Sequence, residues 1–303
     1  MMALPAGLGN YAFLSGEPYA ASASTDMSFQ ESCSEAVEAR GFARDMCGYM
    51  RMYWGSMFQN RFFFGGEFPR PDFCLNLSFC DSHAKWYQQV AEFYNIPFFA
   101  IDYPISPGRT GEERSLEYMV EQMNEAIEWM EKVTGRKYDD ALFIQAVRNE
   151  WLTMCLWGEI CILNKHIPAP IDHKSMFPLW AIAVIMRYDN RAIEFCRLAL
   201  DEIRDRVAHN IAALPDERCR FIDDNLPPWF ALDIYRYLEK YGAVVLGSHH
   251  TFFLAGAMSE GEDGTWVRGK TPEEEGLPMR NRQEALRAYA WWYLRRPLYA
   301  DNI

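Results

Sequence analysis

Apolar runs and helical repeats alternate along the chain, and the first such unit lies between residues 71 and 102. Residues 73–79 are short and largely apolar, as is typical of a strand buried on both faces of a parallel sheet. Apolar side chains then recur at helical spacing from Ala84 to Tyr94, and residues 98–101 form a second apolar run. The pattern predicts a strand, a helix and a parallel strand, which together make a βαβ unit.

The same order of elements returns later in the chain. Residues 219–222 and 243–246 are predicted strands, and the segment from Pro227 to Tyr241 is the predicted helix between them. Long helical stretches are predicted between the two units, at residues 112–133, 139–164 and 190–213. A proline-bearing loop at 167–170 interrupts them.

We therefore predict an α/β fold of two parallel-sheet, flavodoxin-like βαβ units joined by a helical section. The expected division is an N-terminal α/β domain at 1–165, a helical connection at 166–215 and an incomplete C-terminal α/β domain at 216–303.

Polar residues follow three of the predicted strands, at 80–83, 102–103 and 247–250. Open parallel sheets bind ligands outside the carboxyl ends of their strands, so these clusters are candidate site residues. Cys80 lies where a strand meets a helix, and the helix dipole is expected to lower the pKa of its thiol. On position alone, a buried structural cysteine is the commoner interpretation.

Composition and charge narrow the class of protein. Half of the residues are hydrophobic and the formal net charge is −12, which disfavours a sequence-independent nucleic-acid binder because phosphate partners require a basic surface. The longest apolar run, 178–186, is far shorter than the roughly 20 residues that cross a bilayer, so we expect no membrane span and a cytoplasmic protein. The eight cysteines are scattered without a Cys-x-x-Cys pair, which favours reduced thiols or metal ligands.

Several motifs carry a resemblance to a known family: Arg-Asp-Met-Cys-Gly-Tyr-Met-Arg at 44–51, Pro-Asp-Phe at 71–73, Cys-Asp-Ser-His-Ala-Lys-Trp-Tyr at 80–87, Ile96-Pro97 and Asp102-Tyr103-Pro104. Together with residues 227–245, they resemble the 2-hydroxyacyl-CoA dehydratase and benzoyl-CoA reductase family, from about residue 16 onwards. Among its members the chain is most similar to a larger subunit of ATP-dependent (class I) benzoyl-CoA reductase.

The resemblance implies a cofactor and its ligands. Cys47 and Cys80 match two cysteines that bind a [4Fe–4S] cluster in the family. The third cysteine ligand follows a further strand and is expected beyond residue 303, so the chain is expected to be truncated at its C-terminus. The resemblance also implies an acyl-CoA substrate, a homologous sister subunit and a separate ATP-hydrolysing iron–sulfur activator.

The activity implied first is that of an oxidoreductase, which reduces an aromatic acyl-CoA of the benzoyl-CoA type by low-potential single-electron transfer through a ketyl radical. The alternative is a 2-hydroxyacyl-CoA dehydratase, a lyase in which the ketyl expels hydroxide. A hypothesis from another class is a cofactor-free scaffold subunit with core thiols.

Candidate proton donors come from position and from the resemblance. His249 and His250 follow the predicted strand 243–246 and are candidate catalytic residues, although a capping or solvent-facing loop is the commoner interpretation of such a pair. Glu17 is a candidate because its segment resembles a family region that approaches the active site. His83 and His209 are expected to be surface or capping residues. His166 and His173 flank the loop at 167–170 without metal-ligand spacing, so no site role is expected for them either.

Overall fold

The computed structural model describes residues 2–14, 16, 26–78, 80–104, 113–224 and 227–295. Its helices are η1 (Leu4–Leu8), α2 (Met27–Glu38), α3 (Gly48–Phe58), α4 (Asp81–Tyr94), α5 (Glu113–Thr134), α6 (Asp140–Leu163), α7 (His173–Ile185), α8 (Asn190–Ala208), η2 (Trp229–Ala231), α9 (Asp233–Glu239), α10 (His249–Phe253) and α11 (Arg282–Arg295). Its strands are β1 (Cys74–Ser78), β2 (Phe98–Asp102), β3 (Cys219–Asp223), β4 (Ala243–Ser248), β5 (Met258–Glu260) and β6 (Trp266–Arg268).

Two βαβ units are present, as predicted. Strand β1 pairs in parallel with β2, with α4 between them in sequence, and β3 pairs in parallel with β4, with η2 and α9 between them. Each parallel sheet has two strands within the described part of the chain. The α/β fold is therefore confirmed, while the three domain boundaries stay a prediction. The antiparallel pair β5–β6 was not predicted.

The helical section largely follows the sequence pattern. Helices α5 and α6 match the predicted stretches within a few residues, and Asp139 caps α6 by accepting from two backbone N–H groups. Helix α8 ends at Ala208, before the predicted residue 213, because the chain turns at Asn210 with a φ of 53°. Helix α7 was not among the predicted stretches; Asp172 caps it and Pro178 lies inside it.

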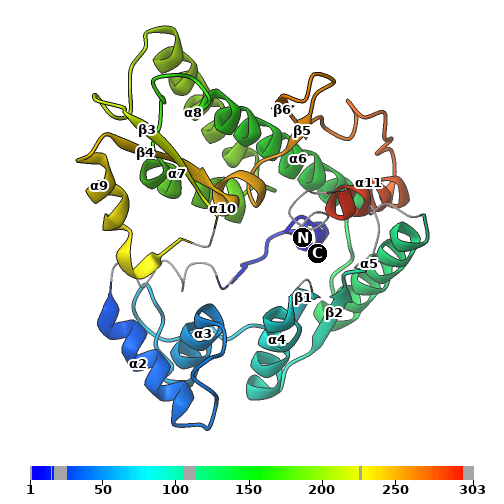
Figure 1. Ribbon diagram of the computed structural model, residues 1–303. Helices are drawn as coiled ribbons and strands as arrows, with labels where there is room; N and C mark the ends of the chain where they lie inside the picture. The colour runs from blue at the N-terminus through cyan, green and yellow to red at the C-terminus, as the bar shows by residue number, and fades with distance from the viewer. Residues whose placement is uncertain are drawn as a thin grey trace.

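The buried side chains form several clusters that these elements share. One joins η1 and the helices α5, α6 and α11, and another joins α2, α3, α4 and β1 (Figure 1). Helix α6 also packs along α8. Among the described residues, no helix is long and apolar enough to span a membrane. The two βαβ units therefore pack on a shared helical framework, and Cys80, His249 and His250 follow the carboxyl ends of their strands.

Candidate functional site

Cys47 and Cys80 occupy equivalent positions in two consecutive helices of the first unit. Each is the N-cap residue, of α3 and α4 respectively, and neither side chain makes a capping hydrogen bond. Cys47 is half-buried and Cys80 is exposed. Because the first turn of a helix presents unpaired N–H groups and a partial positive charge, both thiols lie where an anionic ligand is favoured.

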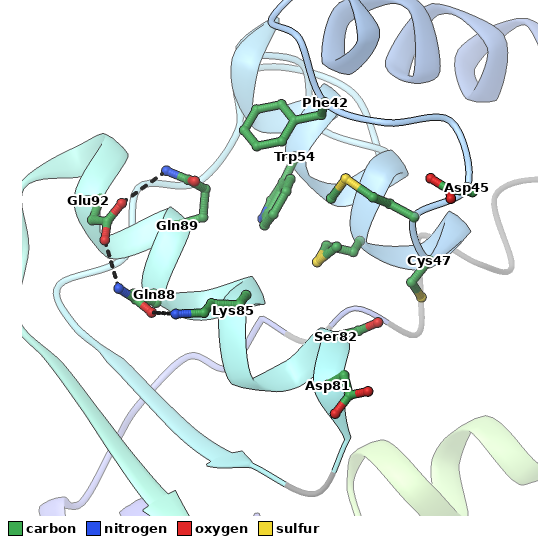
Figure 2. Close-up of a pocket in the computed structure, with 12 residues that line it drawn as sticks. Phe42, Asp45, Cys47, Trp54, Asp81, Ser82, Lys85, Gln88, Gln89 and Glu92 are labelled. Carbon is green, nitrogen blue, oxygen red and sulfur yellow. Dashed lines mark hydrogen bonds between the residues drawn. The ribbon is translucent and has the colours of Figure 1, made fainter.

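The starts of α3 and α4 border a pocket of about 600 Å³. Figure 2 shows Cys47 at one edge, with its sulfur pointing toward Asp81 and Ser82 in the first turn of α4. The lining residues combine apolar and polar side chains; they are Phe42, Asp45, Met46, Cys47, Met50, Trp54, Asp81, Ser82, Lys85, Gln88, Gln89 and Glu92. The pocket is therefore a partly apolar opening with a thiol at its rim.

The environment of Cys80 corrects one expectation. Although the residue as a whole is exposed, desolvation of its sulfur raises the pKa of the Cys80 thiol, and the backbone N–H groups of His83 and Ser82 lower it only in part. The predicted net lowering by the helix start is wrong because the desolvation of the thiolate outweighs those donors. Cys47 also contributes to raising the pKa of Cys80, so the two thiols are close enough to interact electrostatically.

Thiolates are the usual protein ligands of iron–sulfur clusters, so the chemistry of this pair suits such a group. The fit is partial, since in the described ranges no three His, Cys, Asp or Glu side chains gather closely enough to hold a metal ion. Three other cysteines, at 155, 161 and 196, are buried in helices, as expected of core residues. Glu17, the candidate acid, lies outside the described residues.

The histidines His249 and His250 follow β4 directly, as the sequence predicts, but they open the helix α10 instead of lying in a loop. Ser248 caps that helix through a reciprocal pair of hydrogen bonds with Thr251. His250 is buried, with its ring 4.6 Å from that of Trp180 and 6.4 Å from that of Trp229. Aromatic side chains therefore lie against His250, one of the two candidate proton donors.

His173, which the sequence places only beside the proline-bearing loop, is the first residue of α7 and belongs to the protein interior. Its side chain is fully buried, and its Nε2 lies 2.9 Å from the Ser248 hydroxyl. Burial lowers the pKa of His173 to about 4, although Asp223 and Asp172 oppose part of that shift. No local motif marks this residue; the only sequence signal is Asp172, which caps the apolar helix α7.

The third polar cluster, Asp102 and Tyr103, lies at the carboxyl end of β2, where Asp102 is in register with Ser78 of β1. The Asp102 carboxylate accepts a hydrogen bond from Tyr118 of α5, and the buried Tyr103 hydroxyl donates to the Tyr293 carbonyl of α11. These two residues therefore bind β2 to the helical framework.

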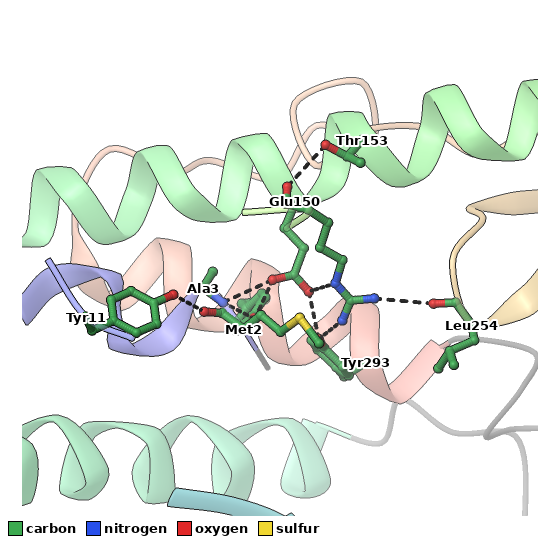
Figure 3. A network of polar contacts seen from close by, with 9 residues as sticks. Met2, Ala3, Tyr11, Glu150, Thr153, Leu254 and Tyr293 are labelled. Atoms are coloured by element: carbon green, nitrogen blue, oxygen red, sulfur yellow. Dashed lines mark hydrogen bonds and ion pairs between the residues drawn. The ribbon is translucent and has the colours of Figure 1, made fainter. Parts of the chain in front are cut away.

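A buried network holds the turn that follows α10 (Figure 3). The Arg187 guanidinium pairs with the Glu150 carboxylate at 2.8 Å and donates to the Leu254 carbonyl at 3.3 Å. Tyr293 and Tyr289 donate to the two oxygens of Glu150 at 2.7 and 2.9 Å. Side chains of α6 and α11 therefore hold the end of α10 in place through Arg187.

Comparison with known proteins identifies relatives of this chain. A family model described as 2-hydroxyglutaryl-CoA dehydratase, D-component, matches residues 19–270. The alpha subunit of (R)-2-hydroxyglutaryl-CoA dehydratase from Acidaminococcus fermentans is 30% identical over 183 residues, which is 59% of this chain and 38% of that subunit. The (R)-phenyllactyl-CoA dehydratase alpha subunit of Clostridium sporogenes is 27% identical, covering 70% of this chain and 52% of the relative.

A third relative, the (R)-2-hydroxyisocaproyl-CoA dehydratase alpha subunit of Clostridioides difficile, is 25% identical and covers 71% of this chain and 53% of its own length. The chain thus spans about half, or less, of the length of these relatives. All three are dehydratase subunits, so they favour the dehydratase alternative over the benzoyl-CoA reductase that the sequence motifs first suggested. Since the family model covers most of the residues, the chain belongs to the 2-hydroxyglutaryl-CoA dehydratase D-component family.

Proposed function

We propose that this chain forms part of one subunit of a 2-hydroxyacyl-CoA dehydratase, a lyase that removes water from a 2-hydroxyacyl thioester. The observation that carries the proposal is the placement of Cys47 and Cys80 as the N-caps of α3 and α4. Cys47 lines the pocket, and so do the two residues that follow Cys80. The dehydratase relatives support the reaction class.

In this proposal Cys47 and Cys80 supply two ligands of a [4Fe–4S] cluster, and the remaining ligands come from outside the described residues. Such a cluster, when bound, supplies single electrons at low potential. The chain's own contribution is to hold both thiols at helix N-termini, where the unpaired N–H groups of the first turns favour the negative charge of thiolates. The raised pKa of the Cys80 thiol means that loading the site must also release a proton from it.

Proton transfer to the departing hydroxyl requires an acid within hydrogen-bond reach of the substrate. We assign this role to His249 and His250, because they stand at the carboxyl end of β4, where parallel sheets bind ligands. Glu17 remains the further candidate acid. The burial of His250 against Trp180 provides the water-poor surroundings that such a reaction needs.

The proposed partners are an acyl-CoA substrate, a homologous sister subunit and an ATP-hydrolysing iron–sulfur activator. The alpha-subunit names of the relatives support the sister subunit. The surface also supports it, because large apolar side chains are exposed on β3, on η2, on α9 and just after α9, as is typical of a protein interface. They are Phe221, Ile222, Phe230, Ile234, Tyr237 and Tyr241.

The test is the iron and acid-labile sulfide content of protein prepared without oxygen together with its sister subunit. Wild type should contain about four irons per cluster, and Cys47→Ala and Cys80→Ala should each lose most of them. Cys219→Ala, which removes another exposed thiol, is the matched control and should keep its iron. A colourless wild type, or iron retained in both alanine variants, would overturn the ligand assignment and favour a scaffold subunit.

The reaction class is tested with two substrates. A reduced and activated preparation should convert a 2-hydroxyacyl-CoA into the corresponding enoyl-CoA with loss of water and no net consumption of electrons. Stoichiometric electron consumption with benzoyl-CoA, without dehydration of the hydroxyacyl thioester, would instead establish the reductase.

A further inference from the structure

The indole of Trp229 joins the two βαβ units. Its Nε1–H donates a hydrogen bond to the hydroxyl of Tyr49, which is 180 residues away in the sequence. Tyr49 is the second residue of α3 and follows Cys47 by two positions. Trp229 opens η2, in the connection between β3 and α9. The bond therefore ties the first turn behind Cys47 to the second unit.

The same indole packs in two apolar clusters. On one side it contacts the cluster of the first unit, which includes Met50 and Trp54 of α3. On the other it packs with Phe177, at 5.4 Å between ring centroids, and lies within 6.4 Å of the His250 ring. In Figure 1 the yellow segment before α9 reaches down toward α2 and α3. Trp229 is thus in contact with elements that carry candidate residues of both units.

The direction of the Cys47 thiol depends on the bond between Tyr49 and Trp229 more than that of an ordinary N-cap side chain would. The Cys47 side chain makes no capping hydrogen bond, so the first turn of α3 sets the direction of the thiol. Tyr49 belongs to that turn. Loss of its bond to Trp229 would remove a directional link between this turn and the second unit, and apolar packing of the indole does not replace that direction.

We propose that Tyr49 and Trp229 are positioning residues, whose hydrogen bond fixes the Cys47 thiol relative to His250 across the junction of the two βαβ units. The role of Cys47 as a cluster ligand rests on the proposed function, whereas the fixed position of its thiol does not. Neither Tyr49 nor Trp229 is itself a ligand or an acid in this proposal.

The first test uses the full chain in its cluster-free, reduced form and a maleimide as the probe. Cys47 is half-buried, and we expect Tyr49→Phe to speed its labelling roughly fivefold, as the loss of one hydrogen bond would. Trp229→Phe should have a similar effect, and the double variant should add little to it, because both changes remove the same bond. Peptide mass spectrometry follows Cys47, with the exposed Cys219 as the internal reference.

Matched variants separate the bond from a general loss of stability. Tyr118→Phe and Trp266→Phe delete an exposed hydroxyl and an exposed indole and should leave Cys47 labelling unchanged. Tyr49→Phe removes a single hydroxyl, so it tests the bond even if Trp229→Phe fails to fold. An unchanged Cys47 rate in folded Tyr49→Phe overturns the proposal, as does a double variant whose effect is the product of the two single effects.

The second test measures the rate at which a chelator removes iron from the loaded complex. We expect Tyr49→Phe to lose iron several-fold faster than wild type and than Tyr118→Phe. Equal rates of iron loss in Tyr49→Phe and wild type would show that Tyr49 does not position Cys47 for the cluster. A wild type without iron overturns the proposed function instead, and the labelling result then decides the positioning of Cys47 by itself.

Discussion

Glu150 and Arg187 form an ion pair 2.8 Å long in which the two side chains are only 2% and 5% exposed. Burial by itself raises the pKa of Glu150, but Arg187 and the hydroxyls of Tyr293 and Tyr289 outweigh it and hold the pKa below its ordinary value. The pair connects α6 to the turn after α10, next to the candidate histidines. The two charges are stable in the interior because each neutralises the other and the two tyrosine hydroxyls donate to the carboxylate.

The first prediction follows from this pairing. Arg187→Met should lower the free energy of unfolding by about 3–5 kcal/mol, because it leaves the Glu150 carboxylate buried without its counter-charge. Urea denaturation measures the change. Arg218→Met removes an exposed ion pair with Asp216 and should cost less than about 1 kcal/mol. Equal effects of the two substitutions would show that burial does not make the Glu150 pair special.

The buried imidazole of His173 predicts a pH dependence. Its pKa is about 4 in the folded chain, against an ordinary value near 6.5, because burial disfavours the charged ring. Between these values the unfolded state binds more protons, so the free energy of unfolding falls as the pH falls from about 6.5 to about 4. The full span corresponds to roughly 3 kcal/mol.

His173→Gln should flatten that pH dependence, which unfolding in urea at a series of pH values measures. His209→Gln, at the exposed C-cap of α8, is the control and should retain the wild-type slope. A variant at 173 that keeps the slope between about pH 4 and pH 6.5 would assign the effect to other groups.

Close packing of α2 against α3 predicts the effect of adding a methyl group. A Cβ at Gly55 would lie 2.1 Å from the carbonyl oxygen of Cys33, so Gly55→Ala should destabilise the protein by about 1–3 kcal/mol. Gly48→Ala lies in the same helix with nothing within 4 Å of its Cβ, and should be neutral or slightly stabilising. Thermal unfolding compares the two. An unaffected Gly55→Ala would mean that the helices can separate without cost.

The exposed apolar side chains of the second unit predict an effect on association. Ile222 of β3 is 66% exposed, so Ile222→Lys should change the stability of this chain by less than about 0.5 kcal/mol. If the sister subunit covers this surface, the same change should weaken the complex roughly tenfold or more in sedimentation experiments. Leu198→Lys, on the exposed face of α8, is the control for added charge. Equal affinities for both variants would place the interface elsewhere.

Local pattern determined much of the architecture. The apolar run at β1, the helical spacing of α4 and the apolar run at β2 are properties of neighbouring residues, and they predicted the parallel pair correctly. The second unit was predicted in the same way, although its helix is divided into η2 and α9. The motifs around Cys47 and Cys80 also led to the right family.

Tertiary structure decided the rest, because it depends on contacts between residues far apart in the chain. No sequence spacing relates Tyr49 to Trp229, or His173 to Ser248, since each pair meets only through the packing of the helical framework. The sequence revealed the helix N–H groups that lower the pKa of the Cys80 thiol. It did not reveal the desolvation that raises this pKa by more. Local residue order determined the elements and the candidate thiols of this protein, whereas burial and long-range packing determined their positions and their charge.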